Sequence, residues 1–344
     1  MQSRRYHPVF TAIAVALLVL ACFQASRRSR GGEVLGTYQT YDFAVFNTIC
    51  RLKVWTDDKA KSDAVARDVL RQLQSLHRTI NVFEPGSELS RLNSNAAEAP
   101  FACSEVLWDI LQASRTVWRQ TDGWFDISFA PLLALWGKGR KTLPEQSELD
   151  AVLPLVGLDK VVFDDEARTV SFPCSGMSLN LGGLAKGYAL DLTRRLLEQA
   201  GFDCFLLDFG GNLYLSRRSP PGMEGFPIGI KHPGNLDQTL CRLELSDCCV
   251  STSANYSRGT TIGEKRIGHI YNARTGQPVS TSGSVTVITP GGVASDAFST
   301  AVFAGGLELA KRLCDMVPGT GFILADEQGN LSTCGQVPPL TGRR

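Results

Sequence analysis

The order of strand-type and helix-type segments most constrains the fold of this 344-residue chain. A run rich in β-branched and aromatic residues predicts a strand pair at 36–55, and apolar residues at three- and four-residue steps predict a helix at 57–79. Later strand-type runs again stand in groups and precede two helices predicted at 295–304 and 307–315. Grouped strands and helices, rather than strict alternation, predict an α+β fold.

Three further helices are predicted between these segments, at 104–119, 143–156 and 182–201. The last of them is expected to bury Leu184, Tyr188, Leu192 and Leu196, which recur at four-residue steps. The further strands are predicted at 161–163, 169–172, 177–181, 204–209, 213–216, 228–231, 240–245, 266–271 and 285–289, with a final strand pair at the end of the chain.

Charge and length exclude some functions. The chain has 35 Lys and Arg against 34 Asp and Glu, a formal charge of +1, and no long basic run. A protein that binds nucleic acid needs clustered positive charge to neutralise phosphates, so no nucleic-acid partner is expected. A chain of this length also buries enough apolar surface to fold without disulfides or a structural metal.

The N-terminal residues have the pattern of a targeting segment. Arg4 and Arg5 precede a stretch at 9–21 that is apolar except for Thr11, has the length of a signal-peptide core and ends next to Cys22. This junction resembles the cleavage site of bacterial lipoproteins. We predict a signal peptide at 1–21, a linker at 22–34 lipidated on Cys22, and a domain at 35–340 anchored on the periplasmic side of the inner membrane. An uncleaved N-terminal anchor and plain secretion are the alternatives.

The cysteine pattern leaves disulfide pairing open. Ten cysteines occur, and removing Cys22 from pairing leaves nine, so at least one thiol is expected to be free. No C-x-x-C occurs, so the spacing of a zinc site is missing. Most of the cysteines are predicted to be small buried apolar residues, although disulfides can form in an oxidising compartment.

Two short segments have the residue types of a nucleotide and metal site. Residues 181–187 combine glycines, which allow close backbone approach, with a predicted helix N-terminus that attracts an anion and with the charge of Lys186. Asp296, Ser299 and Thr300 are predicted to share one helix face, where their oxygens suit a hard cation such as Mg²⁺. A tight turn with packing glycines and a helix cap are the alternatives.

Two other segments have residues that bind a planar ring or move a proton. His269 lies near the end of the strand predicted at 266–271 and precedes a turn, where it is accessible for proton transfer. In 122–126, Trp124 and Phe125 stand between two aspartates, which suits a ring and its hydrogen-bonding edge. A structural histidine and an aromatic core with a capping Asp126 are the alternatives.

In this order the four segments resemble the ApbE family of FAD:protein FMN transferases. The resemblance implies a T-fold-like α+β architecture, with two α/β subdomains and the nucleotide cleft between them. It also implies a Mg²⁺-dependent reaction that releases AMP from FAD and attaches FMN, through a phosphoester bond, to a Ser or Thr hydroxyl of an extracytoplasmic redox protein. The segments that carry the resemblance are 35–37, 87–93, 122–127, 180–191, 208–212, 251–253, 269–278 and 295–301.

The resemblance implies roles for individual residues. His269 would be the base that activates the acceptor hydroxyl, and Asp296 would be the other catalytic residue. The implied metal-binding residues are Asp296, Thr300, Ser299, whose position is Asp in some relatives, and Gly183 through its backbone carbonyl. The residues implied to contact FAD are Leu35, Phe83, Trp124, Phe125, Asp126, Asn180, Lys186 and Tyr271.

Three positions depart from the family pattern. Phe83 stands where relatives often have Tyr, Asn180 replaces a frequent Asp, and Asn-Ala at 272–273 replaces the usual Asp-Pro. Two other functions are compatible with the sequence. One is a Mg²⁺-dependent FAD pyrophosphatase that gives FMN and AMP, and the other is a non-catalytic flavin-binding lipoprotein.

Overall fold

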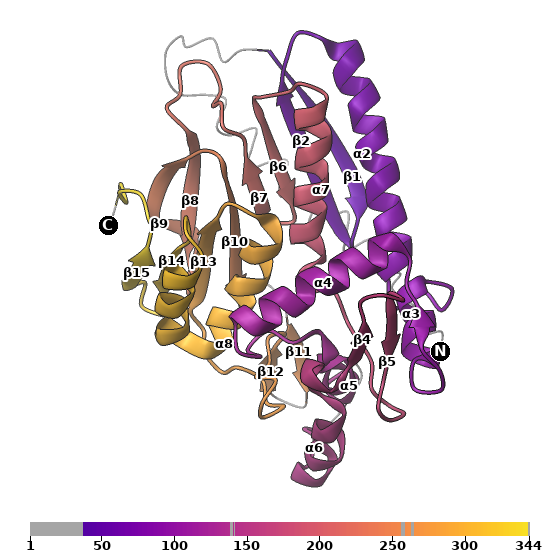
Figure 1. The fold of residues 1–344 in the computed structure, drawn as a ribbon. Coiled ribbons are helices and arrows are strands. Elements are labelled where there is room, and N and C mark those ends of the chain that lie inside the picture. Colours follow the sequence, from indigo (N-terminus) through magenta and orange to yellow (C-terminus); the bar gives the residue numbers. More distant parts are fainter. Residues whose placement is uncertain (1–36, 138–139, 141, 256–258, 263–264, 343–344) are drawn as a thin grey trace, which may run out of the picture. The chain divides into compact units, whose positions relative to one another are not determined.

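An antiparallel sheet of eight strands is the central layer of the computed structural model (Figure 1). The structure describes residues 37–342 except 138–139, 141, 256–258 and 263–264. The predicted signal peptide, Cys22 and Leu35 therefore lie outside the described residues. In spatial order the strands are β1 (Tyr38–Val45), β2 (Thr48–Trp55), β6 (Phe205–Phe209), β7 (Asn212–Leu215), β10 (Cys248–Ala254), β13 (Ser284–Thr289), β14 (Gly321–Ala325) and β15 (Leu331–Gly335).

Three helices pack along one face of this sheet (Figure 1). They are α2 (Lys59–Ile80), which contacts β1, α7 (Ala185–Gln199), which contacts β6 and β7, and α8 (Gly292–Met316), which contacts β10 and β13. A fourth helix, α4 (Glu105–Gln120), contacts both α2 and α8. Apolar side chains such as Leu73 of α2 and Leu207 of β6 are fully buried in the resulting core, whose burial stabilises the fold.

The other face of the sheet carries a separate apolar cluster. The hairpin of β8 (Phe226–His232) and β9 (Asn235–Leu245) covers this face and contributes Phe226 and Leu243 to the cluster. Strand β13 is buried at every position because Val287 points to the helices and Ile288 to the hairpin. The sheet is therefore covered on both faces.

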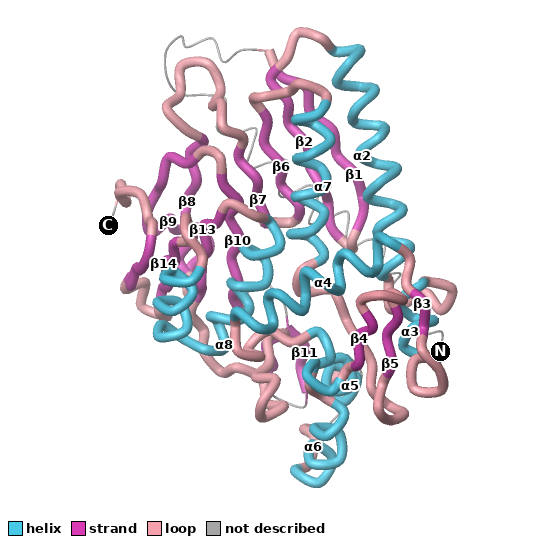
Figure 2. The backbone as a smooth tube through the Cα atoms, in the orientation of Figure 1, coloured by secondary structure: helices cyan, strands magenta, loops and turns pink. Residues whose placement is uncertain are grey.

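Short elements lie beside this layered part (Figure 2). The three-stranded sheet has the order β3 (Phe101–Ala102), β5 (Thr169–Ser171), β4 (Val162–Asp164). The remaining helices and strands are α3 (Glu88–Asn95), η1 (Ile127–Phe129), α5 (Ala130–Leu135), α6 (Gln146–Val152), η2 (Leu153–Leu155), η3 (Leu158–Lys160), β11 (Gly259–Ile262) and β12 (Lys265–Gly268). Among the described residues, no helix is both long enough and apolar enough to span a membrane.

The predicted α+β class is confirmed, and two local predictions are wrong. Residues 177–181 form no strand, because both backbone polar groups of Leu179 bond to the side chain of Asn93, at 2.8 and 2.9 Å, and not to another strand. Helix α7 buries Leu190 and Leu197 most deeply, not the predicted Leu192 and Leu196. It packs against both the sheet and α8, so its buried face is rotated from the predicted one.

The two predicted C-terminal helices are both present, joined as α8. Gly306 interrupts the helix with φ of +77° and ψ of −169°, a conformation that glycine adopts without a steric penalty. The chain therefore bends between the part of α8 that contains Asp296 and the part that ends at Met316.

Helices α7 and α8 touch through their backbones. A Cβ on Gly187 would lie 2.1 Å from the carbonyl oxygen of Gly292, and a Cβ on Gly292 would lie 2.3 Å from that of Gly187. Neither position has room for a side chain, so this close approach requires glycine at both.

We expect Gly187→Ala to lower the free energy of unfolding by about 1–3 kcal/mol, because the added methyl group forces the helices apart. The matched control is Gly291→Ala, since a Cβ on Gly291 would meet no atom within 4 Å. Denaturant unfolding followed by circular dichroism measures both variants. Equal stability of the two variants would contradict the backbone contact.

Candidate functional site

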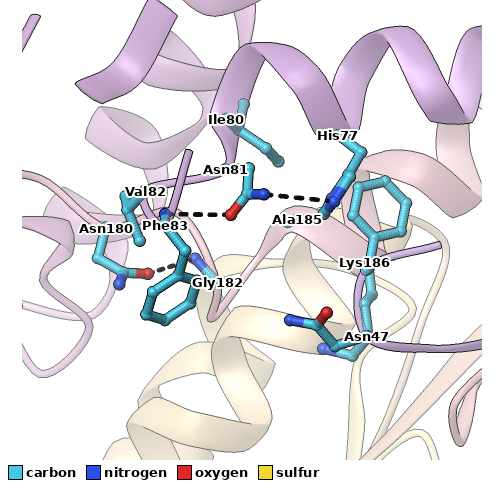
Figure 3. A pocket seen from close by; sticks show the side chains of 11 residues that line it. Asn47, His77, Ile80, Asn81, Val82, Phe83, Asn180, Gly182, Ala185 and Lys186 are labelled. Atoms are coloured by element: carbon cyan, nitrogen blue, oxygen red, sulfur yellow. Dashed lines mark hydrogen bonds between the residues drawn. The ribbon is translucent and has the colours of Figure 1, made fainter. Parts of the chain in front are cut away.

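A cavity of about 360 Å³ opens where the β1–β2 turn, the C-terminal end of α2 and the N-terminal end of α7 meet (Figure 3). Three of the residues implied to contact FAD, Phe83, Asn180 and Lys186, line it. The full lining is Phe46, Asn47, His77, Ile80, Asn81, Val82, Phe83, Asn180, Gly182, Ala185 and Lys186. Aromatic and amide side chains thus share this cavity with one lysine.

The outer wall of the cavity comes from two turns. In the β1–β2 turn, Phe46 and Asn47 have φ of +54° and +56°, a pair of left-handed residues typical of a tight hairpin. After α2, the side chain of Asn81 accepts a hydrogen bond from the backbone N–H of Phe83 at 3.1 Å. The ring of Phe83 is 82% exposed, so a flat apolar surface remains open to a ligand.

The inner wall is the loop that leads into α7. The amide oxygen of Asn180 accepts a hydrogen bond from the Gly182 N–H at 2.8 Å, and the backbone N–H of Asn180 donates to Ile127 at 2.7 Å. These bonds fix a turn at the predicted junction. The turn directs Lys186, in the first turn of α7, into the cavity.

Asp296 of α8 is bound directly to this helix start. One of its carboxylate oxygens accepts a hydrogen bond from the backbone N–H of Gly187 at 3.0 Å, and both oxygens lie 3.3 Å from Nζ of Lys186. Asp296 is buried, with 5% of its surface exposed. The N-terminal end of α7 therefore already contacts an anionic group of the fold, the carboxylate of Asp296, and binding of a nucleotide phosphate there stays a prediction.

The hydroxyls predicted beside Asp296 face β10. Ser299 Oγ lies 2.8 Å from the hydroxyl of Ser253 and donates to the backbone carbonyl of Asp296 at 2.8 Å. Thr300 Oγ1 lies 3.4 Å from the same serine hydroxyl. Ser253 therefore belongs to this group of oxygens, although the sequence alone assigned it no role. Its signal was the alternation in Ser251-Thr252-Ser253, since Ser251 makes the equivalent contact with Ser295 at 2.6 Å.

The oxygen donors fit Mg²⁺ better than they fit a metal bound only by protein. Asp296 supplies a carboxylate and Thr300 a hydroxyl, both hard oxygen ligands. Among the described residues no group of three or more His, Cys, Asp and Glu side chains could hold a metal ion. Mg²⁺ needs no such group, because it keeps several waters and is completed by substrate phosphates.

Gly183 and the predicted aromatic segment are in contact. A Cβ on Gly183 would lie 2.9 Å from the ring of Phe125, so this ring excludes any side chain at Gly183. Phe125 is itself buried. It supports the loop at the start of α7 through this packing contact, and direct contact with FAD stays a prediction.

Asp126 makes the hydrogen bonds of a capping aspartate, which was the alternative to a ring-binding role. Its Oδ1 accepts hydrogen bonds from the backbone N–H and the hydroxyl of Ser128 at 2.7 and 2.6 Å. Its Oδ2 accepts from Trp118 Nε1 and from the backbone N–H of Leu158, both at 3.0 Å. Both oxygens are thus used in joining η1, α4 and η3, and contact with FAD stays a prediction.

Arg274 joins two of the predicted site segments. Its guanidinium donates to the backbone carbonyl and the carboxylate of Asp122 at 2.7 and 2.9 Å, and it lies 4.7 Å above the ring of Trp124. Both contacts connect the turn after His269 to the aromatic segment at 122–126. No local pattern in the sequence pointed to Arg274, because its partner lies 152 residues away.

Tyr271 and His269 occupy different surroundings. Tyr271 packs against Phe129 and Trp136, with ring centroids 5.3 and 5.9 Å away, and burial raises the pKa of its phenol. His269 is exposed, as a base that acts on an external hydroxyl needs to be. The structure describes neither as part of the cavity lining, so their roles stay predictions.

A buried carboxylate positions the helix that contains Asp296. The two oxygens of Asp191 in α7 accept hydrogen bonds from the first N–H groups of α8, at Gly292 (2.7 Å) and Val293 (3.0 Å). Burial raises the pKa of Asp191, and these two bonds oppose that rise. Asp296 follows one turn later, so Asp191 acts on the site through the start of α8.

Solved structures with the same fold define the class of protein. An ApbE protein from Thermotoga maritima has 25% sequence identity, covering 86% of this chain and 96% of that chain, with a TM-score of 0.76. The flavin transferase ApbE from Vibrio cholerae shares the fold, with a TM-score of 0.76 at 21% identity over 87% of this chain and 96% of that chain. The predicted ApbE-type α+β architecture is therefore confirmed.

The sequence comparisons agree with the fold. The model of the ApbE family matches residues 46–324, so the chain belongs to the ApbE family. A FAD:protein FMN transferase of Escherichia coli K12 is 27% identical over 311 residues, which are 88% of this chain and 87% of the relative. Another, from Treponema pallidum, is 27% identical over 329 residues, 90% of this chain and 91% of the relative.

We expect Asp191→Ala to lower the free energy of unfolding by about 1–3 kcal/mol, because it leaves two N–H groups at the start of α8 without their acceptor. Asp191→Asn keeps one acceptor oxygen in place, so it should lose clearly less. Denaturant unfolding of the two variants beside the parent measures the difference. Two variants as stable as the parent would show that Asp191 does not hold α8.

Proposed function

We propose that this protein is a Mg²⁺-dependent FAD:protein FMN transferase. It splits the pyrophosphate of FAD, releases AMP and attaches FMN through a phosphoester bond to a Ser or Thr hydroxyl of a partner protein. The observation that carries the proposal is the Lys186–Asp296 ion pair, because its lysine lines a cavity that also exposes Phe83. The names of the relatives support it.

The cavity offers contacts for both the planar ring and the phosphates of a flavin nucleotide. The exposed ring of Phe83 offers a surface for stacking a planar ring, and the amides of Asn47, Asn81 and Asn180 offer hydrogen bonds to its polar edge. Lys186 brings a positive charge to the same cavity. Phosphoryl transfer depends mainly on such positioning and charge neutralisation, so no internal nucleophile is needed.

Asp296, Ser299, Thr300 and the carbonyl of Gly183 would hold the metal, which would supply Lewis-acid stabilisation of the phosphate charge. The N–H of Gly187 orients the Asp296 carboxylate, and Lys186 balances its charge. His269 would take the proton from the acceptor hydroxyl, and its exposure suits a nucleophile that arrives on another protein.

We further propose that the enzyme works outside the cytoplasm. The predicted signal peptide at 1–21 and lipidation of Cys22 would anchor it to the periplasmic side of the inner membrane. Its acceptors would be membrane redox proteins with extracytoplasmic segments that contain a Ser/Thr flavinylation motif.

The test mixes the purified protein with FAD, Mg²⁺ and an acceptor that contains such a motif, and follows fluorescent acceptor on a denaturing gel together with AMP. Labelled acceptor and AMP release that EDTA stops would support the transferase. Free FMN and AMP without labelled acceptor would support the pyrophosphatase. Bound, intact FAD would support the flavin-binding alternative, and either of these results would overturn the proposal.

We expect Asp296→Ala to abolish transfer, a fall of at least about a hundredfold, because the site loses its carboxylate metal ligand. Asp296→Asn keeps an acceptor for the Gly187 N–H and should also be inactive while retaining stability. The matched control, Asp237→Ala, changes an exposed aspartate of β9 and should leave AMP release unchanged. Unchanged turnover in both Asp296 variants would contradict the assignment of Asp296 as a metal ligand.

For His269→Ala we expect FAD still to bind, while transfer slows about 10²–10⁴-fold because proton removal from the acceptor is lost. FAD binding is measured by flavin fluorescence and transfer by labelled acceptor. His232→Ala, in the β8–β9 hairpin, is the matched histidine control. Equal transfer rates for parent and His269→Ala would demote His269 to a structural role.

A further inference from the structure

Two cysteines outside the candidate functional site have their sulfur atoms in contact. Cys314, in the last turns of α8, and Cys334, in β15, have Sγ atoms 3.7 Å apart although they are 20 residues apart in the chain. Both side chains are half-buried. Of the other described cysteines, Cys50, Cys204, Cys241, Cys248 and Cys249 are buried.

We propose that Cys314 and Cys334 are the site of an intramolecular disulfide. The oxidant would be a disulfide, either that of a thiol-disulfide oxidoreductase or of a small thiol such as glutathione. The bond would join the C-terminal part of α8 to the end of the central sheet. This inference does not depend on the proposed transferase activity.

The backbone already holds the two sulfurs in position. Cys334 pairs with the fully buried Phe322 across β14 and β15, and Leu313, the neighbour of Cys314, is also fully buried. Neither segment must be brought from elsewhere, so closing the bond needs only the last approach of the side chains, from 3.7 Å to the S–S distance of about 2.05 Å.

Because Gly335 has no side chain, it leaves room for the thiol of Cys314. Its φ is +72°, and a Cβ at this position would lie 2.4 Å from Sγ of Cys314. Any side chain here would therefore collide with the thiol. Because β15 is the last strand of the sheet, with a neighbour on one side, the pair lies at an edge that an oxidant can reach.

The two neighbouring cysteines of β10 are arranged differently. Cys248 and Cys249 are adjacent in β10, but Cys249 belongs to the helix-side core and Cys248 to the hairpin-side cluster. Their side chains point to opposite faces of the sheet. Cys174 is exposed, which makes it a reference thiol for the experiment.

The surroundings indicate which thiol reacts first. Burial raises the pKa of both thiols, to about 12 for Cys314. At Cys334 the hydrogen bond that it accepts from the Cys314 thiol and the charge of Lys311 lower the pKa, whereas the charge of Asp315 adds to the rise. Cys334 is therefore the better thiolate and the first nucleophile.

The exchange has two balanced steps. The Cys334 thiolate attacks one sulfur of the oxidant RS–SR, forms a mixed disulfide and displaces RS⁻. The Cys314 thiolate then attacks Sγ of Cys334 and displaces the second RS⁻. The two protein thiols lose two electrons and two protons, and the oxidant becomes two RSH.

The bond would stabilise the fold without entering the candidate site. It closes a 20-residue loop and so reduces the conformational freedom of the unfolded chain. Gly306 interrupts α8 between Cys314 and Asp296, and the side chains proposed to bind the metal lie in the N-terminal part of the helix. We therefore expect oxidation to raise Tm and to leave FAD turnover unchanged.

The experiment treats the reduced full chain with oxidised glutathione, alkylates the remaining thiols and analyses the peptides by mass spectrometry. We expect a Cys314–Cys334 linked peptide about 2 Da lighter than the sum of the reduced peptides. Its formation should accelerate about tenfold per unit between pH 7 and 9, because the thiolate fraction rises. Tm should rise by about 5 °C and return to its initial value with dithiothreitol.

Single variants separate the linked pair from general oxidation. Cys314→Ser should stop at a glutathione adduct on Cys334, with no linked peptide and no rise in Tm. Cys174→Ser, which removes the exposed reference thiol, should behave as the parent. Full alkylation of both cysteines after oxidation, stable glutathione adducts on both in the parent, or the same rise in Tm in Cys314→Ser would overturn the proposal.

Discussion

The candidate site depends on the contact between the starts of α7 and α8. The backbones meet at Gly187 and Gly292, where no side chain fits, and Asp191 holds the first N–H groups of α8. This close approach lets the Gly187 N–H reach the carboxylate of Asp296. Because the oxygens have a backbone donor and the Lys186 ammonium beside them, the negative charge of a buried aspartate is tolerated there.

The surroundings of the site divide into open and occupied surfaces. Phe83 remains open at the cavity, whereas Trp124 already lies under the guanidinium of Arg274 and Asp126 is fully hydrogen-bonded. Stacking on a flat, exposed ring costs little rearrangement, and for this reason we propose that a flavin would stack on Phe83. The occupied residues instead hold the loops that surround it.

Much of the fold could be predicted from local patterns. The apolar period of α2 and the strand pair β1–β2 are strong signals because each element buries one face. Helix α3 was missed because it is one short element with only two buried residues, Leu89 and Leu92. Strand β10 was missed because its buried serines and cysteines fill both faces, which removes the alternation of apolar and polar residues.

The sequence by itself determined the α+β class, most helices and the residue types needed for a nucleotide and a metal. Only the tertiary structure decided which of them meet. Lys186 and Asp296 are 110 residues apart, Arg274 and Asp122 152, and Cys314 and Cys334 are on a helix and the last strand. Periodicity reports the environment of one element, whereas such pairs depend on strand order, register and helix packing, which join distant parts of the chain.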